Sequence, residues 1–425
     1  MVYSATPRGR ILQLIIHKGS QEIGGTCIQL SYESCTILLD VGLPLAPDSI
    51  PVDVKGLHPN AVFISHSHQD HFGLIEAMDE SIPVYCGELS RELMDAARLF
   101  TGRRPLLNNF NYFKAWEPLT VEAFKVTPYL VDHSASDAYG FLIEAGGERV
   151  FYSGDFRARG RKAILFDKLV AKPPPNIDVL FLEGTMLRRS NSDFNDEEDV
   201  ETAIARTISD QETITFLICS SQNIDRLVSA FKACGDHGKT LVIDAYTAWV
   251  LEKLKLASKK VPNISMEPVK VYVSKRQNEV LQLNKSRFGS FVDEVFDDEN
   301  RILPDELHAH PADFLYVAKQ SSFPIIRKHI EGGLVNIIYS QWLGYLEEDR
   351  WSSYGARETA AFRDDPNVHF TYAHTGGHAV LEDLKRFATA INPRILIPIH
   401  TEHGDDFHEH FEKVLELDDK QELVI

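Results

Sequence analysis

Four side chains that commonly bind metal ions lie within six consecutive positions: His66, His68, Asp70 and His71. They directly follow Ala61–Ile64, an apolar run with the composition of a buried strand. On an extended segment, residues two apart point in the same direction, so His66 and His68 are expected to reach one ion. Asp70 and His71, on the turn that follows, are expected to reach a second ion nearby. Imidazole and carboxylate without thiolate favour zinc or manganese in an open, catalytic site, so the sequence predicts a centre of two divalent ions.

Two further acidic residues stand at the ends of predicted strands. Asp40 follows the run Thr36–Leu39, and Asp155 follows the run Val150–Tyr152. A glycine lies within two positions of each. Loops at strand ends are where a rigid sheet presents its ionisable groups. We therefore expect both carboxylates to take part in the chemistry of the protein.

The rest of the chain alternates between strand-like and helix-like patterns, which indicates an α/β protein. In the first half, short β-type runs are separated by turn residues, and Leu89–Phe100 carries apolar residues on one helical face. A stiff bend at Pro173-Pro174-Pro175 and the polar stretch Arg188–Asp199 come next. From 213 to 257, strand and helix alternate in the manner of βαβ units, which predicts a second, parallel sheet. We place a domain boundary near Asn195.

The overall composition describes a globular protein with an acidic surface. The chain has 425 residues, 44% of them hydrophobic, and a formal net charge of -18 at pH 7. A diffuse acidic surface repels phosphate groups, so nucleic-acid binding would have to depend on a local basic track. The five cysteines form no C-x-x-C pair, which argues against a disulfide framework or a thiolate zinc site. Ile11–Ile16 is too short for a signal sequence and no later run approaches the roughly 18 apolar residues of a membrane helix, so we expect a soluble, cytoplasmic protein.

The segment from His66 to His71 resembles the H-x-H-x-D-H signature of the metallo-β-lactamase superfamily, whose fold is an αββα sandwich. Three further positions match this family in order along the chain. Asp40 matches an early aspartate that supports the ligand loop from behind the metal. His133, in Asp132-His133-Ser134, matches the third histidine of the first ion, and Asp155 matches the aspartate that bridges both ions.

A predicted ligand far along the chain indicates one group within this superfamily. The best candidate for the last ligand, His400, lies 245 positions beyond Asp155 (400 − 155). An insertion of that size resembles the β-CASP nucleases, which include RNase J. The positions that match motifs A, B and C of that group are Glu183, His378 and His400. The implied organisation is a metallo-β-lactamase core at 1–195, an inserted α/β domain of the β-CASP kind at 196–365, and a returning core segment at 366–425.

The resemblance also implies a ligand set and a mechanism. One zinc ion, with manganese as the alternative, would bind His66, His68 and His133; a second would bind Asp70, His71 and His400; and Asp155 would bridge the two. A water molecule between the ions would act as the nucleophile. His378 would donate a proton to the leaving 3′ oxygen, and Glu183 would orient His378 and raise its pKa. The residues expected to act in catalysis are Asp70, Asp155, Glu183 and His378.

The expected substrate is single-stranded RNA. RNA-processing β-CASP members resemble one another in having histidine in motif C, as at His400, whereas the DNA-repair branch usually has valine. Phosphate groups are expected to meet a cationic cluster made of Arg157, Arg159, Arg161 and Lys162. Ser340, at a strand end of the inserted domain, and His374, near motif B, are further candidates for substrate binding. The implied activity is that of an RNase J-like exo- or endoribonuclease.

Several alternatives stay open beside this interpretation. One is a DNA nuclease of the same group, and another is a small-molecule metallohydrolase for an ester, lactone or cyclic nucleotide, with the insert as a lid. An inactive scaffold is disfavoured because the ligands are intact.

The sequence also differs from RNase J. RNase J has serine where this chain has Gly376, so the side chain that helps RNase J to hold a 5′ phosphate is missing. The chain ends soon after His400, so we expect the extra C-terminal domain of RNase J to be absent; a homo-oligomer is left open.

Overall fold

The computed structural model of the chain describes residues 11–46, 48–189, 194–209, 212–347 and 354–425. The chain forms two compact units. The core unit comprises Met1–Met94, Leu106–Ser190 and Gly377–Ile425, and the inserted unit comprises Asp95–Pro105 and Asn191–Gly376. The long insertion thus leaves the core unit after Ser190 and returns to it at Gly377, so His374 belongs to the inserted unit and His378 to the core unit.

The first sheet of the core unit has seven strands in the order β19-β1-β2-β3-β4-β5-β6. Their bounds are β1 Gln13–Lys18, β2 Cys27–Tyr32, β3 Cys35–Leu39, β4 Ala61–Phe63, β5 Pro83–Cys86, β6 Asn109–Tyr112 and β19 Glu422–Val424. The strands β1 to β3 are antiparallel, whereas β3 to β6 are parallel. β19 pairs with β1 through Leu14 and Leu423, so the last strand completes the sheet that the first strand begins.

The second sheet of the core unit has six strands in the order β18-β11-β10-β9-β8-β7. Their bounds are β7 Leu119–Val121, β8 Phe124–Val131, β9 Ala138–Ala145, β10 Glu148–Tyr152, β11 Val179–Glu183 and β18 Ile395–Ile399. β10, β11 and β18 are parallel, and Glu183 at the end of β11 stands in register with Ile399 at the end of β18. This register places Glu183 next to His400, the residue that follows β18.

The two sheets pack face to face through apolar side chains that alternate along their strands. Ile16, Leu30 and Phe63 of the first sheet share one buried cluster with Phe141 and Phe181 of the second sheet. The rings of Phe63 and Phe141 meet edge to face with centroids 5.8 Å apart, a favoured aromatic geometry. Each fully buried side chain of this kind contributes roughly 1.5 to 3 kcal/mol to folding, so this interface is the main support of the core unit.

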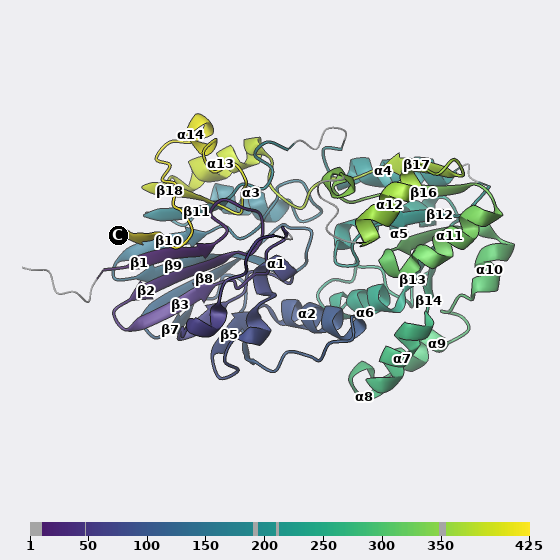
Figure 1. Cartoon of the computed structure of the whole chain (residues 1–425), viewed down its shortest axis with the longest axis horizontal. Helices are drawn as coiled ribbons and strands as arrows, with labels where there is room; N and C mark the ends of the chain where they lie inside the picture. The colour runs from purple at the N-terminus through teal and green to yellow at the C-terminus, as the bar shows by residue number, and fades with distance from the viewer. Residues whose placement is uncertain (1–10, 47, 190–193, 210–211, 348–353) are drawn as a thin grey trace, which may run out of the picture. The chain divides into compact units, whose positions relative to one another are not determined.

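Helices cover the outer faces of both sheets, as Figure 1 shows for the core unit. α1 (Gln69–Phe72) and the first part of α2 (Glu88–Phe100) pack on the first sheet, where Phe72 and Met94 join Val62 in a buried cluster. On the second sheet lie α3 (Ile164–Ala171), α13 (Leu381–Ile391) and α14 (Phe407–His410). These layers confirm the predicted mixed α/β class and the αββα sandwich.

The inserted unit is built on a parallel sheet of six strands in the order β14-β13-β15-β12-β16-β17. The strands are β12 Thr215–Ile218, β13 Thr240–Asp244, β14 Val269–Tyr272, β15 Phe314–Ala318, β16 Val335–Tyr339 and β17 Val368–Tyr372. The helices are α4 Glu197–Ser209, α5 Ile224–Asp236, α6 Ala245–Leu254, α7 Lys275–Leu283, α8 Lys285–Phe288, α9 Phe291–Phe296, α10 Pro304–Ala309, α11 Phe323–Gly332 and α12 Tyr354–Arg363. The predicted parallel sheet is therefore present.

Among the helices of the described residues, none combines the length and the apolar character that a membrane span requires.

A buried ion pair ties together the loops at one edge of this sheet. Arg226 on α5 is fully buried, and its Nη2 lies 3.2 Å from Oε1 of Glu197 on α4. Its Nη1 donates to the carbonyl oxygen of Ser340 at 3.1 Å. Nδ1 of His374 lies 3.1 Å from the same oxygen. Arg226 thus holds in one place the two residues of the inserted unit that were predicted to bind substrate.

Candidate metal centre

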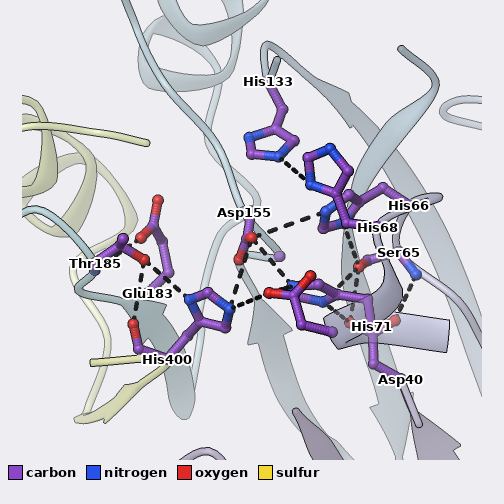
Figure 2. A network of polar contacts seen from close by, with 12 residues as sticks. Asp40, Ser65, His66, His68, His71, His133, Asp155, Glu183, Thr185 and His400 are labelled. Carbon is purple, nitrogen blue, oxygen red and sulfur yellow. Dashed lines mark hydrogen bonds and ion pairs between the residues drawn. The ribbon is translucent and has the colours of Figure 1, made fainter. Parts of the chain in front are cut away.

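The strands of the core unit bring their carboxyl ends to one site (Figure 2). The residues that follow strands there are Asp40 after β3, His66, His68, Asp70 and His71 after β4, His133 after β8, Asp155 after β10 and His400 after β18, while Glu183 ends β11. Segments more than 300 positions apart in the chain thereby meet. The predicted ligands form two groups within this site.

The first group consists of His66, His68 and His133, whose ligand atoms all lie within 4.8 Å of one another. Nδ1 of His133 lies 2.6 Å from the carbonyl oxygen of Gly377, which can only accept, so this nitrogen carries the proton. Nε2 of His133 is left with its lone pair and lies 3.3 Å from Nδ1 of His68. A Cβ atom at position 377 would lie 2.7 Å from Oγ of Ser134 and 3.2 Å from Cε1 of His133, so a larger residue there would require these side chains to shift.

The second group consists of Asp70, His71, Asp155 and His400, again with all ligand atoms within 4.8 Å. Nε2 of His71 lies 3.1 Å from Oδ2 of Asp155. Nε2 of His400 lies 3.2 Å from Oδ2 of Asp70. All four side chains are buried, which removes them from competing water and makes their charges felt strongly.

Asp40 contacts Nδ1 of His71, the ring nitrogen on the side away from the other predicted ligands. Its Oδ2 lies 2.8 Å from Nδ1 of His71 and accepts hydrogen bonds from the hydroxyls of Ser65 at 2.7 Å and Tyr152 at 2.5 Å. Its Oδ1 accepts from the backbone amide of Ser65 at 2.7 Å. Because Asp40 binds Nδ1, the nitrogen of His71 that faces the centre is Nε2. Asp40 itself has a φ of 57°, a left-handed conformation that aspartate adopts more readily than most residues.

The protonation states suit metal binding. Burial, together with the neighbouring histidines, lowers the pKa of His66 and His133 well below the ordinary value, so both are neutral ligands. Burial opposes the charge on Asp155, but His400 and His71 outweigh it and hold its pKa well below the ordinary value. A metal ion requires neutral imidazole and ionised carboxylate, so His66, His133 and Asp155 are in the form that binds metal.

The hydrogen-bond partners and the local charge of the buried atoms show whether these residues fit metal ions. Nε2 of His66 is buried and has no hydrogen-bond partner among the described residues. Burial lowers the pKa of His71, yet Asp155, Asp40 and Asp70 together raise it well above the ordinary value. A buried lone pair without a partner and a local excess of carboxylates are both what cations would satisfy. The residues therefore fit two divalent ions.

Glu183 and His378 form a pair beside the second group. Oε1 of Glu183 lies 3.3 Å from Nδ1 of His378, and Oε2 accepts from the backbone amide of Thr185 at 3.0 Å. Burial lowers the pKa of His378, but Glu183 and Asp155 outweigh it, so the pKa is raised. Glu183 is fully buried, whereas the side chain of His378 keeps 21% of its exposure. His378 is thus the member of the pair that can meet a ligand.

Three residues in this network were not identified in the sequence: Ser65, Tyr152 and Thr185. Ser65 directly precedes His66, and Tyr152 ends β10 three positions before Asp155. Thr185 follows Glu183 by two positions, and its Oγ1 lies 2.9 Å from Nδ1 of His400. The only available signal was proximity to a motif, which does not say where a hydroxyl points.

The cationic residues after Asp155 differ in their surroundings. Arg157 is buried, with Nε 3.3 Å from Oδ1 of Asp132, so it is placed to order the loop. Arg159 is 33% exposed and pairs with Asp383 at 3.0 Å. Arg161 and Lys162 are partly exposed. The other predicted substrate residues, Ser340 and His374, lie in the inserted unit next to Arg226.

The chain is similar to known proteins in sequence and in fold. The model of the Beta-lactamase superfamily domain matches residues 37–214. A crystal structure of a protein of unknown function from Enterococcus faecalis V583 has the same fold, with a TM-score of 0.76 at 20% identity over 98% of this chain and 100% of that one. The chain thus has the metallo-β-lactamase fold, and its residues 37–214 are similar to the Beta-lactamase superfamily domain.

The chain is RNase J-like over most of its length. It is 22% identical over 415 residues to Ribonuclease J of Mycoplasma pneumoniae, covering 91% of this chain and 67% of the relative. It is 21% identical over 410 residues to Ribonuclease J of Helicobacter pylori strain B128, covering 91% of this chain and 55% of the relative. An RNase J-like protein of Methanocaldococcus jannaschii is 28% identical over 184 residues, 40% of this chain and 42% of the relative. The chain therefore spans about half to two thirds of the bacterial relatives that it matches along most of its length.

Proposed function

We propose that this protein is a metal-dependent ribonuclease that hydrolyses phosphodiester bonds in single-stranded RNA. The observation that supports the proposal is the meeting of seven side chains that could hold metal ions with the Glu183–His378 pair at one site. Two ion sites with a proton donor beside them suit the displacement of an oxygen from a phosphodiester. Relatives named Ribonuclease J support RNA as the substrate, and so does the histidine at position 400.

The proposed ion sites use all seven predicted ligands. His66, His68 and His133 would hold one ion, Asp70, His71 and His400 the other, and Asp155 both. We assign zinc, with manganese as the alternative, because nitrogen and carboxylate donors without thiolate suit both. When bound, the two ions would lower the pKa of a water molecule and neutralise charge on the phosphate oxygens.

The remaining residues handle protons and position. His378, held by Glu183, would donate a proton to the 3′ oxygen that leaves the phosphorus atom. Asp40 keeps Nε2 of His71 aimed at the centre, and Gly377 does the same for His133. These bonds fix the histidines before substrate arrives, so little reorganisation is needed during the reaction.

Substrate contact is assigned to a local cationic track because the chain as a whole is acidic. Arg159, Arg161 and Lys162 would meet phosphate groups, and Arg157 would order their loop through Asp132. Ser340 and His374, within the inserted unit, are further candidates for phosphate contact. Recognition of a 5′ phosphate would proceed without the serine that RNase J has at the position of Gly376.

The test is an assay on defined oligonucleotides. Purified protein is incubated with Zn²⁺ or Mn²⁺ and single-stranded RNA or DNA, labelled at either end, with or without a 5′ phosphate. We expect cleavage of RNA, with a ladder or single-nucleotide products that distinguish endonuclease from exonuclease action, and none from Asp70→Ala. The proposal fails if RNA stays intact while DNA, or a cyclic nucleotide or ester substrate, is hydrolysed in an Asp70-dependent manner.

A further inference from the structure

Thr185 connects the Glu183–His378 pair with the second ion site. It follows β11 by two positions and is buried, with 6% of its surface exposed. Its backbone amide donates to Oε2 of Glu183 at 3.0 Å. Its hydroxyl lies 2.9 Å from Nδ1 of His400 and 3.3 Å from the carbonyl oxygen of His400 (Figure 2). One residue therefore touches both a predicted metal ligand and the carboxylate that holds the predicted proton donor.

The hydrogen-bonding capacity of this hydroxyl constrains His400. A threonine hydroxyl donates one hydrogen and accepts through two lone pairs. If its hydrogen goes to the carbonyl oxygen of His400, the hydroxyl accepts from Nδ1, and Nε2 keeps a free lone pair. If its hydrogen goes to Nδ1 instead, the proton of His400 lies on Nε2, which faces Asp70 at 3.2 Å. Only the first arrangement offers an imidazole lone pair to an ion.

The backbone geometry favours that first arrangement. His400 has a φ of 51°, a left-handed conformation directly after the end of β18. Its backbone amide donates to the carbonyl oxygen of Gly19 at 2.7 Å, and the amide of Gly184 donates to the carbonyl oxygen of Ile399 at 3.1 Å. These bonds fix the loop, so the carbonyl oxygen of His400 stays 3.3 Å from the Thr185 hydroxyl, where it can accept the hydrogen.

Two of the other ligand histidines, His71 and His133, are oriented by groups that can only accept. Asp40 accepts from His71, and the carbonyl oxygen of Gly377 accepts from His133. His400 has neither a carboxylate nor a backbone oxygen at its Nδ1, but a hydroxyl whose direction is itself set by a second bond. The tautomer of His400 therefore depends on Thr185 in a way that a shape-matched apolar side chain cannot reproduce.

We infer that Thr185 is a positioning residue for the second metal ion: its hydroxyl sets the tautomer of His400, while its amide holds Glu183. The inference rests on the proposed metal centre and does not require that the substrate is RNA. A purely structural role would predict a loss of stability without a selective loss of one ion. The selective effect follows because Thr185 touches His400 and none of His66, His68 and His133 in the described contacts.

The test compares Thr185→Val, which keeps the shape but lacks the hydroxyl, with Thr185→Ser, which keeps the hydroxyl. Zn²⁺ is titrated into the full chain after metal removal, with a chromophoric chelator as competitor. We expect Thr185→Val to bind the first ion as the wild type does and the second about 10- to 100-fold more weakly. Thr185→Ser should bind both ions with wild-type affinities. If Thr185→Val folds poorly, Thr185→Ala provides a smaller variant without the hydroxyl, with the same expected result.

Thr401→Val is the matched control. Thr401 is buried next to His400, and its hydroxyl accepts from the amide of His403 at 3.1 Å rather than contacting the imidazole. This variant should retain both ions. The inference is overturned if Thr185→Val retains the second ion, if Thr185→Ser loses it equally, or if Thr401→Val weakens it to the same extent. Since Zn²⁺ is the only ligand in these titrations, a failure of the ribonuclease assay would leave their outcome unaffected.

Discussion

The hydroxyl of Tyr152 lies 2.5 Å from Oδ2 of Asp40, the carboxylate oxygen that also holds Nδ1 of His71. Burial and the nearby Asp40 raise the pKa of Tyr152 well above the ordinary value, so the phenol stays protonated and donates. A carboxylate that is supported on several sides in this way keeps one orientation. Tyr152, at the end of β10, thereby helps to fix a ligand that follows β4.

Removing this hydroxyl should loosen the ion site without unfolding the protein. For Tyr152→Phe we expect roughly 10-fold weaker binding of Zn²⁺ at the site that contains His71, because Asp40 loses one of its donors. The loss of one buried hydrogen bond should lower the free energy of unfolding by about 1 kcal/mol. Chelator competition and thermal unfolding of the metal-free chain measure the two effects. Tyr129→Phe, on β8 beside Phe151, is the control, and an equal loss of Zn²⁺ affinity there would refute the role of Tyr152.

Glu183→Gln should separate turnover from metal binding. The amide keeps the volume of the side chain but removes the negative charge beside Nδ1 of His378, so His378 becomes a poorer proton donor. We expect turnover to fall by roughly 10²- to 10⁴-fold, the range for a lost general acid. Elemental analysis of the same preparation should still find both ions. A variant that loses its ions would show that Glu183 belongs to the ligand set instead.

The buried pair Arg226–Glu197 should dominate the stability of the inserted unit. Arg226→Ala would leave the buried carboxylate of Glu197 without its cation, which typically costs about 3 to 5 kcal/mol. Lys232→Ala, on the same helix, removes a pair with Glu201 in which the lysine side chain is 48% exposed, and should cost under about 1 kcal/mol. Urea unfolding followed by circular dichroism compares the two. Similar costs would mean that the burial of Arg226 has little energetic weight.

The inserted unit should also lose stability in acid through His329. Burial lowers the pKa of His329 to about 4, helped by the neighbouring His308 and Lys328. The rings of His329 and His308 stack with centroids 4.2 Å apart, and Nε2 of His329 is buried without a hydrogen-bond partner among the described residues. In the unfolded chain this histidine takes up a proton near pH 6.5, whereas in the folded chain it stays neutral down to about pH 4.

This difference in proton uptake decides whether the free energy of unfolding rises or falls with pH. Between these two pH values the unfolded state binds more protons, so the free energy of unfolding falls as the pH falls, by about 1 to 2 kcal/mol after allowance for solvent screening. His329→Leu should remove this contribution. Urea titrations of the wild type and of His329→Leu at pH 7, 6, 5 and 4 test it, because contributions of the metal centre cancel in the difference. A difference between the two proteins that does not change with pH would contradict the prediction.

The parts of the site that the sequence could predict are those with short-range patterns. His66, His68, Asp70 and His71 lie in one dense motif, and a strand followed by a turn already fixes where they point. His400 could be assigned only through the family resemblance, because nothing local connects it with residues more than 300 positions earlier. The α/β class was predictable for the same reason as the motif, since strand and helix periodicity are local properties, whereas the αββα sandwich was implied by the family resemblance.

Contacts that depend on register and burial could not be predicted. Thr185 meets His400 because Glu183 and Ile399 stand opposite each other in parallel strands, a pairing that the sequence does not express. Arg157 looked like the start of a cationic track, yet it faces Asp132 in the interior. Charge can be read from a sequence, but the direction of a side chain in a loop is set by the folded surroundings.

The pairing of β18 with β11 affects how the protein folds while it is being translated on the ribosome. While the inserted unit is being translated, β11 has an unpaired edge, and such edges invite association with other chains. The second ion site also lacks His400 during that time. We expect the nascent core unit to be prone to aggregation and chaperone-dependent until the segment after Gly377 emerges, and to gain its full affinity for metal only after that segment has folded.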